Sequence, residues 1–84
     1  MVFIVVGAPG CGVCTQVKNY LDGKEQKYTY LDLYDMDHED TMYYQKVANQ
    51  SFRSVPQTFV NVEGELQYLG AGLPVVQEYV ANLG

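Results

Sequence analysis

Two cysteines, Cys11 and Cys14, are the residues whose types and spacing most directly predict chemistry in this chain. They follow an apolar segment and the breaker sequence Gly7–Gly10, and they precede a segment with helical periodicity. Two thiols one helical turn apart can close a small disulfide and open it again, which is the geometry of a dithiol redox centre. The unpaired N–H groups and partial positive charge of a helix N-terminus favour the thiolate form of Cys11. Cys14, one turn deeper, is then placed to resolve a mixed disulfide formed at Cys11.

Three other roles for the cysteine pair are open at this stage. A structural zinc site normally takes four ligands, and beyond the two cysteines the chain offers only His38 and distant carboxylates. A permanent structural disulfide would close a very small loop and remove little chain entropy. Inert buried cysteines are the third possibility. The order of strand, breaker, C-x-x-C and helix favours the redox role, and Lys18 is placed to add positive potential on the same helix face.

Length and composition predict a single domain over residues 1–84. The chain has 48% hydrophobic residues and only two cysteines, which suits a globular core and not a disulfide-built secreted scaffold. No apolar run approaches the roughly 20 residues of a membrane span, and the first residues lack the basic region of a signal peptide. We therefore expect a cytoplasmic protein that does not bind membranes and acts as a monomer.

The charge distribution excludes one class of partner. The formal net charge is −5, and the few basic residues are scattered along the chain. Nucleic-acid binding needs a basic surface, so no nucleic-acid partner is expected. The acidic run from Asp32 to Asp40 lacks the central glycine and the distant glutamate of a calcium loop. It is better interpreted as a solvated loop that leads into a helix N-terminus, with His38 as a surface residue.

Hydrophobic periodicity and breakers predict the element order β-α-β-α-β-β-α and an α/β fold. The expected strands are Val2–Val6, Lys27–Leu33, Gln57–Val62 and Leu66–Leu69. The expected helices are Cys11–Leu21, His38–Ala48 and a segment whose apolar stripe runs from Leu73 to Leu83. A right-handed crossover should make the first two strands parallel, and a hairpin at Glu63-Gly64 should make the last two antiparallel. The result is a four-stranded mixed sheet flanked by helices.

Element ends are predicted from the local breakers and caps. Asp22-Gly23 should end the first helix with a left-handed residue, and Asp37 should cap the N-terminus of the second helix. Gly70-Ala71-Gly72 should separate the last strand from the last helix, with Pro74 in the first helical turn.

These features together resemble the glutaredoxins of the thioredoxin superfamily. The resemblance rests on the element order, on Cys11-Gly12-Val13-Cys14, on Arg53-Ser54-Val55-Pro56-Gln57 before the third strand, and on Gly70-Ala71 before the last helix. It covers essentially the whole chain. The segment Ser51–Pro56 is also similar to that of the glutaredoxin-like redoxins that reduce ribonucleotide reductase. The resemblance implies a thioredoxin-like fold and a dithiol–disulfide oxidoreductase.

The resemblance also implies roles for individual residues. Cys11 would be the nucleophile and Cys14 the resolving thiol. Val55-Pro56 would form a cis peptide that leaves the backbone of Val55 free to pair with glutathione or a substrate chain. The remaining substrate-binding positions that the resemblance implies are Val13, Arg53, Gly70 and Ala71. Arg53 would meet a glutathione carboxylate, since a guanidinium suits a planar anion.

The sequence departs from the family pattern at three places. Gly12 and Val13 replace the usual Pro and Tyr between the cysteines, and Gly72 stands where the family has an Asp that binds glutathione. In the family, a small residue in place of that Pro accompanies binding of a 2Fe-2S cluster between two protomers. Two functions follow as hypotheses. The first is reduction of protein or glutathione mixed disulfides, with ribonucleotide reductase as one candidate acceptor. Glutathione or thioredoxin reductase would restore the dithiol, and no metal is obligatory. The second is a glutathione-ligated 2Fe-2S carrier.

Overall fold

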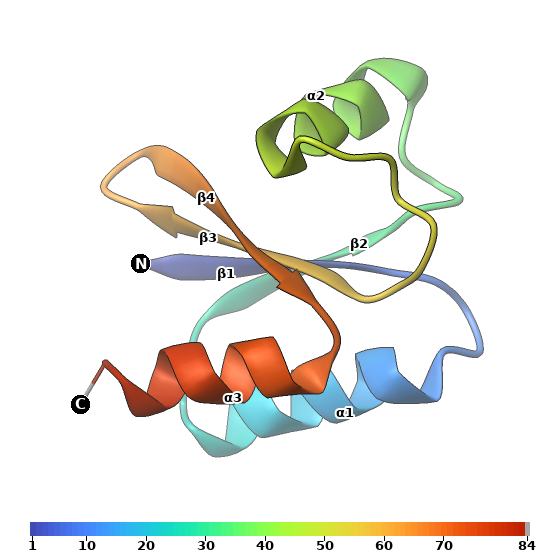
Figure 1. Cartoon of the computed structure of the whole chain (residues 1–84). Coiled ribbons are helices and arrows are strands. Elements are labelled where there is room, and N and C mark those ends of the chain that lie inside the picture. Colours follow the sequence, from blue (N-terminus) through green and yellow to red (C-terminus); the bar gives the residue numbers. More distant parts are fainter. Residues whose placement is uncertain (84) are drawn as a thin grey trace.

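Four strands form one mixed sheet in the order β2-β1-β3-β4, and helices cover both of its faces in the computed structural model (Figure 1). The structure describes residues 1–83. The elements are β1 (Val2–Gly7), α1 (Gly12–Gly23), β2 (Tyr28–Asp32), α2 (His38–Ala48), β3 (Gln57–Val62), β4 (Glu65–Ala71) and α3 (Leu73–Ala81). Helices α1 and α3 lie on one face of the sheet and α2 lies on the other (Figure 1). The predicted fold class and element order are confirmed.

Strand β1 lies in the middle of the sheet because its residues are apolar on both faces. It pairs parallel with β2 from Phe3 opposite Tyr28 to Gly7 opposite Asp32. On its other side it pairs antiparallel with β3. The end of β1 at Gly7 therefore leads into the loop that carries Cys11, and this loop lies where β3 begins.

The two faces of the sheet have different cores. Between the sheet and helices α1 and α3, a buried cluster forms from Phe3, Val5, Val17, Leu21, Val60 and Val76. On the α2 face, Phe59 is fully buried and lies at the centre of an aromatic cluster. Its ring centroid is 5.1 Å from that of Tyr44, 6.0 Å from that of Phe52 and 5.2 Å from that of Tyr68. Because α2 has no fully buried residue of its own, this aromatic cluster is its main attachment to the sheet.

The cap of α2 follows the prediction and the end of α1 does not. The Asp37 carboxylate accepts a hydrogen bond of 2.8 Å from the N–H of Asp40, as an N-cap does. Helix α1 continues through Gly23, and the left-handed residue is Glu25, with φ 56°. The N–H of Lys24 still bonds to the carbonyl of Tyr20 at 3.1 Å. The helical hydrogen bonds thus continue beyond the end predicted at Asp22-Gly23.

The last strand and the last helix also differ from the prediction at their ends. Strand β4 includes Gly70 and Ala71, which pair with Thr58 and Gln57, so the predicted break is reduced to Gly72. A register shift between Thr58 and Phe59 accommodates this extension, and the φ of Gly70 is 142°. Helix α3 ends at Ala81, and Leu83 is 44% exposed, outside the apolar stripe predicted for it. Within the described residues, no helix has the length and apolarity needed to cross a bilayer.

Candidate redox site

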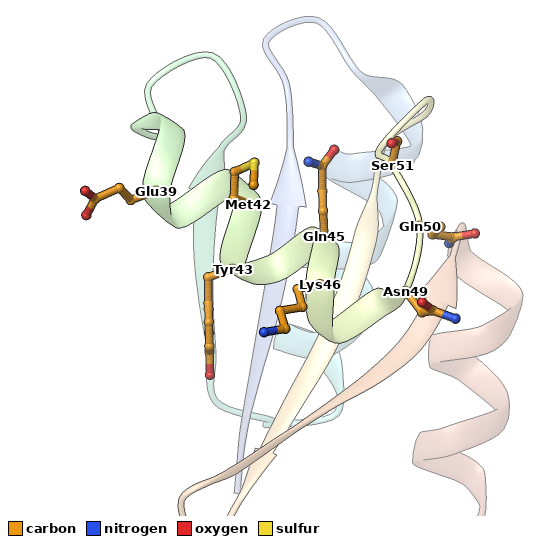
Figure 2. A pocket seen from close by; sticks show the side chains of 8 residues that line it. All are labelled: Glu39, Met42, Tyr43, Gln45, Lys46, Asn49, Gln50 and Ser51. Atoms are coloured by element: carbon orange, nitrogen blue, oxygen red, sulfur yellow. The ribbon is translucent and has the colours of Figure 1, made fainter.

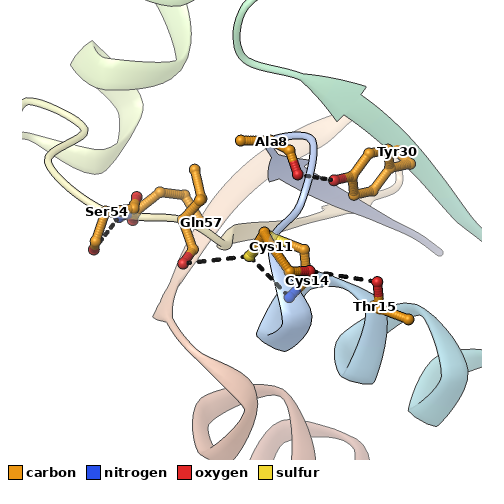
Figure 3. The surroundings of a disulfide bond; sticks show 8 residues. Ala8, Cys11, Cys14, Thr15, Tyr30, Ser54 and Gln57 are labelled. Atoms are coloured by element: carbon orange, nitrogen blue, oxygen red, sulfur yellow. Dashed lines mark hydrogen bonds between the residues drawn. A yellow bond between two sulfur atoms is a disulfide. The ribbon is translucent and has the colours of Figure 1, made fainter.

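Cys11 and Cys14 form a disulfide at the N-terminus of α1, with their Cα atoms 5.3 Å apart (Figure 3). Cys11 is the N-cap residue, with extended backbone angles, and its Sγ accepts a hydrogen bond of 3.1 Å from the N–H of Cys14. After reduction, the same N–H would stabilise a thiolate at Cys11, together with the partial positive charge of the helix end. Cys14 is 1% exposed, whereas Cys11 is half-buried. An external disulfide can therefore reach Cys11 and not Cys14.

Tyr30 holds the loop that presents Cys11. The Tyr30 hydroxyl donates to the carbonyl oxygen of Ala8 at 3.4 Å (Figure 3). Its ring lies against Gly7, where an added Cβ would overlap the phenol. Burial, and then the carboxylate of Asp32, raise the pKa of Tyr30 above its ordinary value of 10.0. The tyrosine thus stays neutral at physiological pH and remains a hydrogen-bond donor.

The Lys18 side chain contacts Tyr30 and lines the same hollow as Cys11. Its Nζ is 4.1 Å from the centroid of the Tyr30 ring, a cation–π contact. Both residues line a hollow of about 500 Å³ that also includes Cys11. The ammonium group of Lys18 is thus placed over the neighbouring tyrosine, and its positive charge borders the open side of Cys11.

The Val55-Pro56 peptide bond is cis, and it lies beside the disulfide. The carbonyl oxygen of Val55 is 3.9 Å from the Sγ of Cys11, across 44 positions of sequence. Pro56 is buried, and its carbonyl accepts a hydrogen bond of 3.1 Å from the N–H of Gly72. The fold therefore brings together the nucleophile and the segment that the sequence predicts to receive a substrate backbone.

The other predicted substrate-binding residues lie on three different parts of the fold. Arg53 is exposed, and with Ala71 it lines a hollow of about 450 Å³ that includes Ser54 and Gln57. Gly70 lies in β4 next to Ala71, and a Cβ at this position would be 3.1 Å from the side chain of Val75. Val13 is 41% exposed on the first turn of α1, between the two cysteines. It provides an aliphatic surface where the family pattern has an aromatic ring.

Gln50 and Gln57, which were not predicted as site residues, also line this hollow. Gln57 is 3% exposed, and its Nε2 donates to the carbonyl of Ser54 at 2.8 Å (Figure 3). The hydroxyl of Tyr68 donates to the Oε1 of Gln57 at 2.6 Å. The Nε2 of Gln50 donates to the hydroxyl of Tyr68, also at 2.6 Å. The one signal in the sequence is a glutamine that directly follows Pro56 at the start of a strand, and its partners depend on the fold.

A separate hollow of about 500 Å³ lies on the outer surface of α2 and the turn after it (Figure 2). Its lining residues are Glu39, Met42, Tyr43, Gln45, Lys46, Asn49, Gln50 and Ser51. It includes neither cysteine nor any other predicted site residue. Among residues 1–83, no three His, Cys, Asp or Glu side chains gather closely enough to hold a metal ion.

The fold and the site define a class of protein. A C-x-x-C disulfide at a helix N-terminus, facing a cis-proline segment on a mixed four-stranded sheet, is the arrangement of a thiol–disulfide oxidoreductase with a thioredoxin-like fold. The glutaredoxin family model matches residues 1–65. The chain belongs to the glutaredoxin family.

Two solved structures agree with this assignment. Reduced Escherichia coli glutaredoxin is 26% identical in sequence, with a TM-score of 0.70, over 98% of this chain and 95% of that one. A buckwheat glutaredoxin–glutathione complex is 24% identical, with a TM-score of 0.68, over 95% of this chain and 68% of that one. A search of curated protein sequences gives no significant match.

Proposed function

We propose that this protein reduces mixed disulfides between glutathione and protein thiols, and that glutathione restores its dithiol. The observation that carries this proposal is the position of the Val55 carbonyl, 3.9 Å from the Sγ of Cys11. An extended substrate that pairs with the backbone of Val55 would have its disulfide next to the accessible sulfur. Arg53 at the edge of the same segment supplies a cation for a carboxylate of glutathione. The structural likeness to a glutaredoxin solved with glutathione supports this choice of ligand.

The reaction proceeds by two thiol–disulfide exchanges that conserve electrons. The Cys11 thiolate attacks the glutathione sulfur of the mixed disulfide, the old S–S bond breaks, and the substrate leaves as a thiolate that takes a proton from water. A second glutathione thiolate then attacks the glutathionyl sulfur and releases Cys11 and glutathione disulfide. For a protein disulfide, Cys14 attacks Cys11 instead, which releases the reduced substrate and leaves the Cys11–Cys14 disulfide. Two further glutathione molecules reduce this disulfide.

Single-cysteine variants test this scheme. Cys11→Ser should abolish both reactions because it removes the accessible sulfur. Cys14→Ser should keep turnover of a glutathionylated peptide and lose the reduction of protein disulfides. Mass spectrometry of Cys14→Ser after one turnover should find a single glutathionyl group on Cys11. Full activity of Cys11→Ser, or loss of both activities in Cys14→Ser, would contradict the assigned roles.

The physiological partners belong to the same proposal. A reducing compartment such as the cytosol supplies the electrons that this cycle needs, and a monomer is sufficient for it. Ribonucleotide reductase is a candidate acceptor because the Ser51–Pro56 segment is similar to that of the redoxins that reduce it. Thioredoxin reductase is the corresponding alternative electron donor. A coupled assay with NADPH and each reductase separates the two donors.

A second candidate function is carriage of a 2Fe-2S cluster between two protomers. The observation that favours it is the open space at Gly12, where an added Cβ would have no neighbour within 4 Å. Cys11 is partly exposed beside this glycine, so its thiolate and a glutathione thiolate from each protomer would fit the usual all-thiolate ligand set. Anaerobic reconstitution tests it: visible absorbance with bound iron supports the carrier role, and colourless iron-free protein excludes it.

A further inference from the structure

Three polar side chains form a continuous set of hydrogen bonds that ends at Ser54, next to the Val55-Pro56 segment of the redox site. The Nε2 of Gln50 donates to the Tyr68 hydroxyl at 2.6 Å, and this hydroxyl donates to the Oε1 of Gln57 at 2.6 Å. The Nε2 of Gln57 then donates to the carbonyl of Ser54 at 2.8 Å, and the same Nε2 is 3.4 Å from the Ser54 hydroxyl. We refer to Gln50, Tyr68 and Gln57 as the relay. It connects the turn after α2, strand β4 and strand β3 to the residue that precedes Val55.

The relay has one consistent direction. A phenol has a single proton, so a hydroxyl that donates to Gln57 must accept from Gln50. With its oxygen occupied by Tyr68, Gln57 presents its amino group to the carbonyl of Ser54. If the Gln57 amide were flipped, two oxygens would face each other at Ser54. The Ser54 carbonyl, which can only accept, therefore orients the Gln57 amide, and the Tyr68 hydroxyl completes this arrangement by donating to the Oε1 of Gln57.

The residues before β3 depend on a few contacts for their position. The N–H of Phe52 donates to the Oε1 of Gln45 at 2.8 Å, at one end of the segment. The carbonyl of Pro56 accepts from the N–H of Gly72 at 3.1 Å, at the other end. Between these two points, the hydrogen bond from Gln57 to the Ser54 carbonyl fixes the residue next to Val55. Gln57 is 3% exposed, so water does not readily replace its partners.

We propose that the relay is a positioning device for the redox reaction, with Tyr68 as its central residue. It holds the Ser54–Pro56 segment so that the backbone of Val55 meets a substrate next to Cys11. This inference rests on the proposed function, because it concerns how the disulfide substrate binds. The relay touches neither sulfur, so it acts on substrate binding and leaves the intrinsic reactivity of Cys11 unchanged.

The variant Tyr68→Phe removes the hydroxyl and keeps the ring that packs on Phe59. The KM for a glutathionylated peptide should rise about three- to tenfold, the change that corresponds to one lost hydrogen bond, while kcat stays within about twofold. The alkylation rate of Cys11 by iodoacetamide should not change, since this reaction does not use Val55. Tyr28→Phe is the matched control, because its hydroxyl bonds to Asp22 and its strand position lies opposite Phe3, far from the end of β1 that leads to Cys11.

A double variant separates positioning from stability. Tyr68→Phe leaves the buried Oε1 of Gln57 without its donor and should lower the thermal midpoint. Tyr68→Phe combined with Gln57→Leu removes the hydroxyl and the buried amide together, so it should recover this loss. Its KM should remain raised because Gln57→Leu removes the hydrogen bond to the Ser54 carbonyl. A KM that returns to the wild-type value together with the midpoint would overturn the proposal. An unchanged KM in Tyr68→Phe would overturn it as well.

Failure of the proposed function would be recognised separately. A wild-type protein that does not turn over the glutathionylated peptide refutes that function, and with it any catalytic role of the relay. The relay as a structural feature is tested by the side-chain amide protons of Gln57, followed by NMR. They should exchange slowly with solvent in the wild type and faster in Tyr68→Phe. Fast exchange in the wild type would refute the relay itself.

Discussion

Substitution of Gly7 by alanine should destabilise the protein through one specific neighbour, Tyr30. A Cβ on Gly7 would overlap the hydroxyl and ring of Tyr30, so the phenol must move. Movement breaks the hydrogen bond from Tyr30 to Ala8 and the contact with the Lys18 ammonium. A neutral hydrogen bond contributes about 1 kcal/mol and an exposed cation–π contact about 0.5–1 kcal/mol. Against the gain of about 0.4–1 kcal/mol that alanine brings by restricting the unfolded chain, the net loss should be about 0.5–1.5 kcal/mol.

A double-mutant cycle makes this prediction specific. In a Tyr30→Ala background the phenol is absent, so Gly7→Ala should cost close to nothing. The free energies of unfolding of the four proteins would be measured by urea denaturation of the reduced form, with the urea dependence checked for a constant slope. The coupling between the two positions should be at least about 1 kcal/mol. If Gly7→Ala costs the same in both backgrounds to within about 0.5 kcal/mol, the packing of Tyr30 over the loop is wrong.

Four further measurements test other parts of the structure. Asp37→Ala should lower the free energy of unfolding by about 1 kcal/mol, whereas Asp37→Asn should cost much less because an asparagine side chain still caps α2. Phe59→Ala should cost about 3–5 kcal/mol, a large part of the roughly 4–13 kcal/mol expected for a chain of this size, and hydrogen exchange should show α2 released first. In an ultraviolet titration, Tyr30→Phe should remove a component that ionises above pH 10. Because folding raises the pKa of Tyr30, its protonated form contributes fully to stability below pH 10. This contribution is lost as the pH rises through the raised pKa. In the reduced protein, iodoacetamide should label Cys11 about a hundredfold faster than Cys14, since labelling of a 1% exposed thiol requires a local opening of about 3 kcal/mol.

Helices and strands could be predicted where the spacing of apolar residues and the positions of breaker or cap residues indicate the same element. The continuous apolar run of β1 and the Asp37 cap of α2 have local signals, and both are found where the sequence places them. Among the ends that differ, that of β4 depends on pairing with a distant strand. Gly70 and Ala71 look like a break in isolation, but partners on β3 extend β4 through them.

The site was predictable to the extent that it follows a motif. The cysteine spacing indicates the chemistry, and the family resemblance supplies the cis peptide at Val55-Pro56, which no local rule would give. The supporting residues could not be predicted. Tyr30 and Tyr68 are ordinary strand residues in the sequence, and only the sheet register brings their hydroxyls to the Cys11 loop and to Gln57.

The most direct test of the account is to oxidise the protein and follow the reopening of the Cys11–Cys14 disulfide. Glutathione with glutathione reductase and NADPH is one donor system, and thioredoxin reductase with NADPH alone is the other. The glutathione system should reduce the disulfide, and Cys14→Ser should still turn over a glutathionylated peptide. Reduction by thioredoxin reductase alone, with no response to glutathione, would contradict the proposed use of glutathione and the role of Arg53 in binding it.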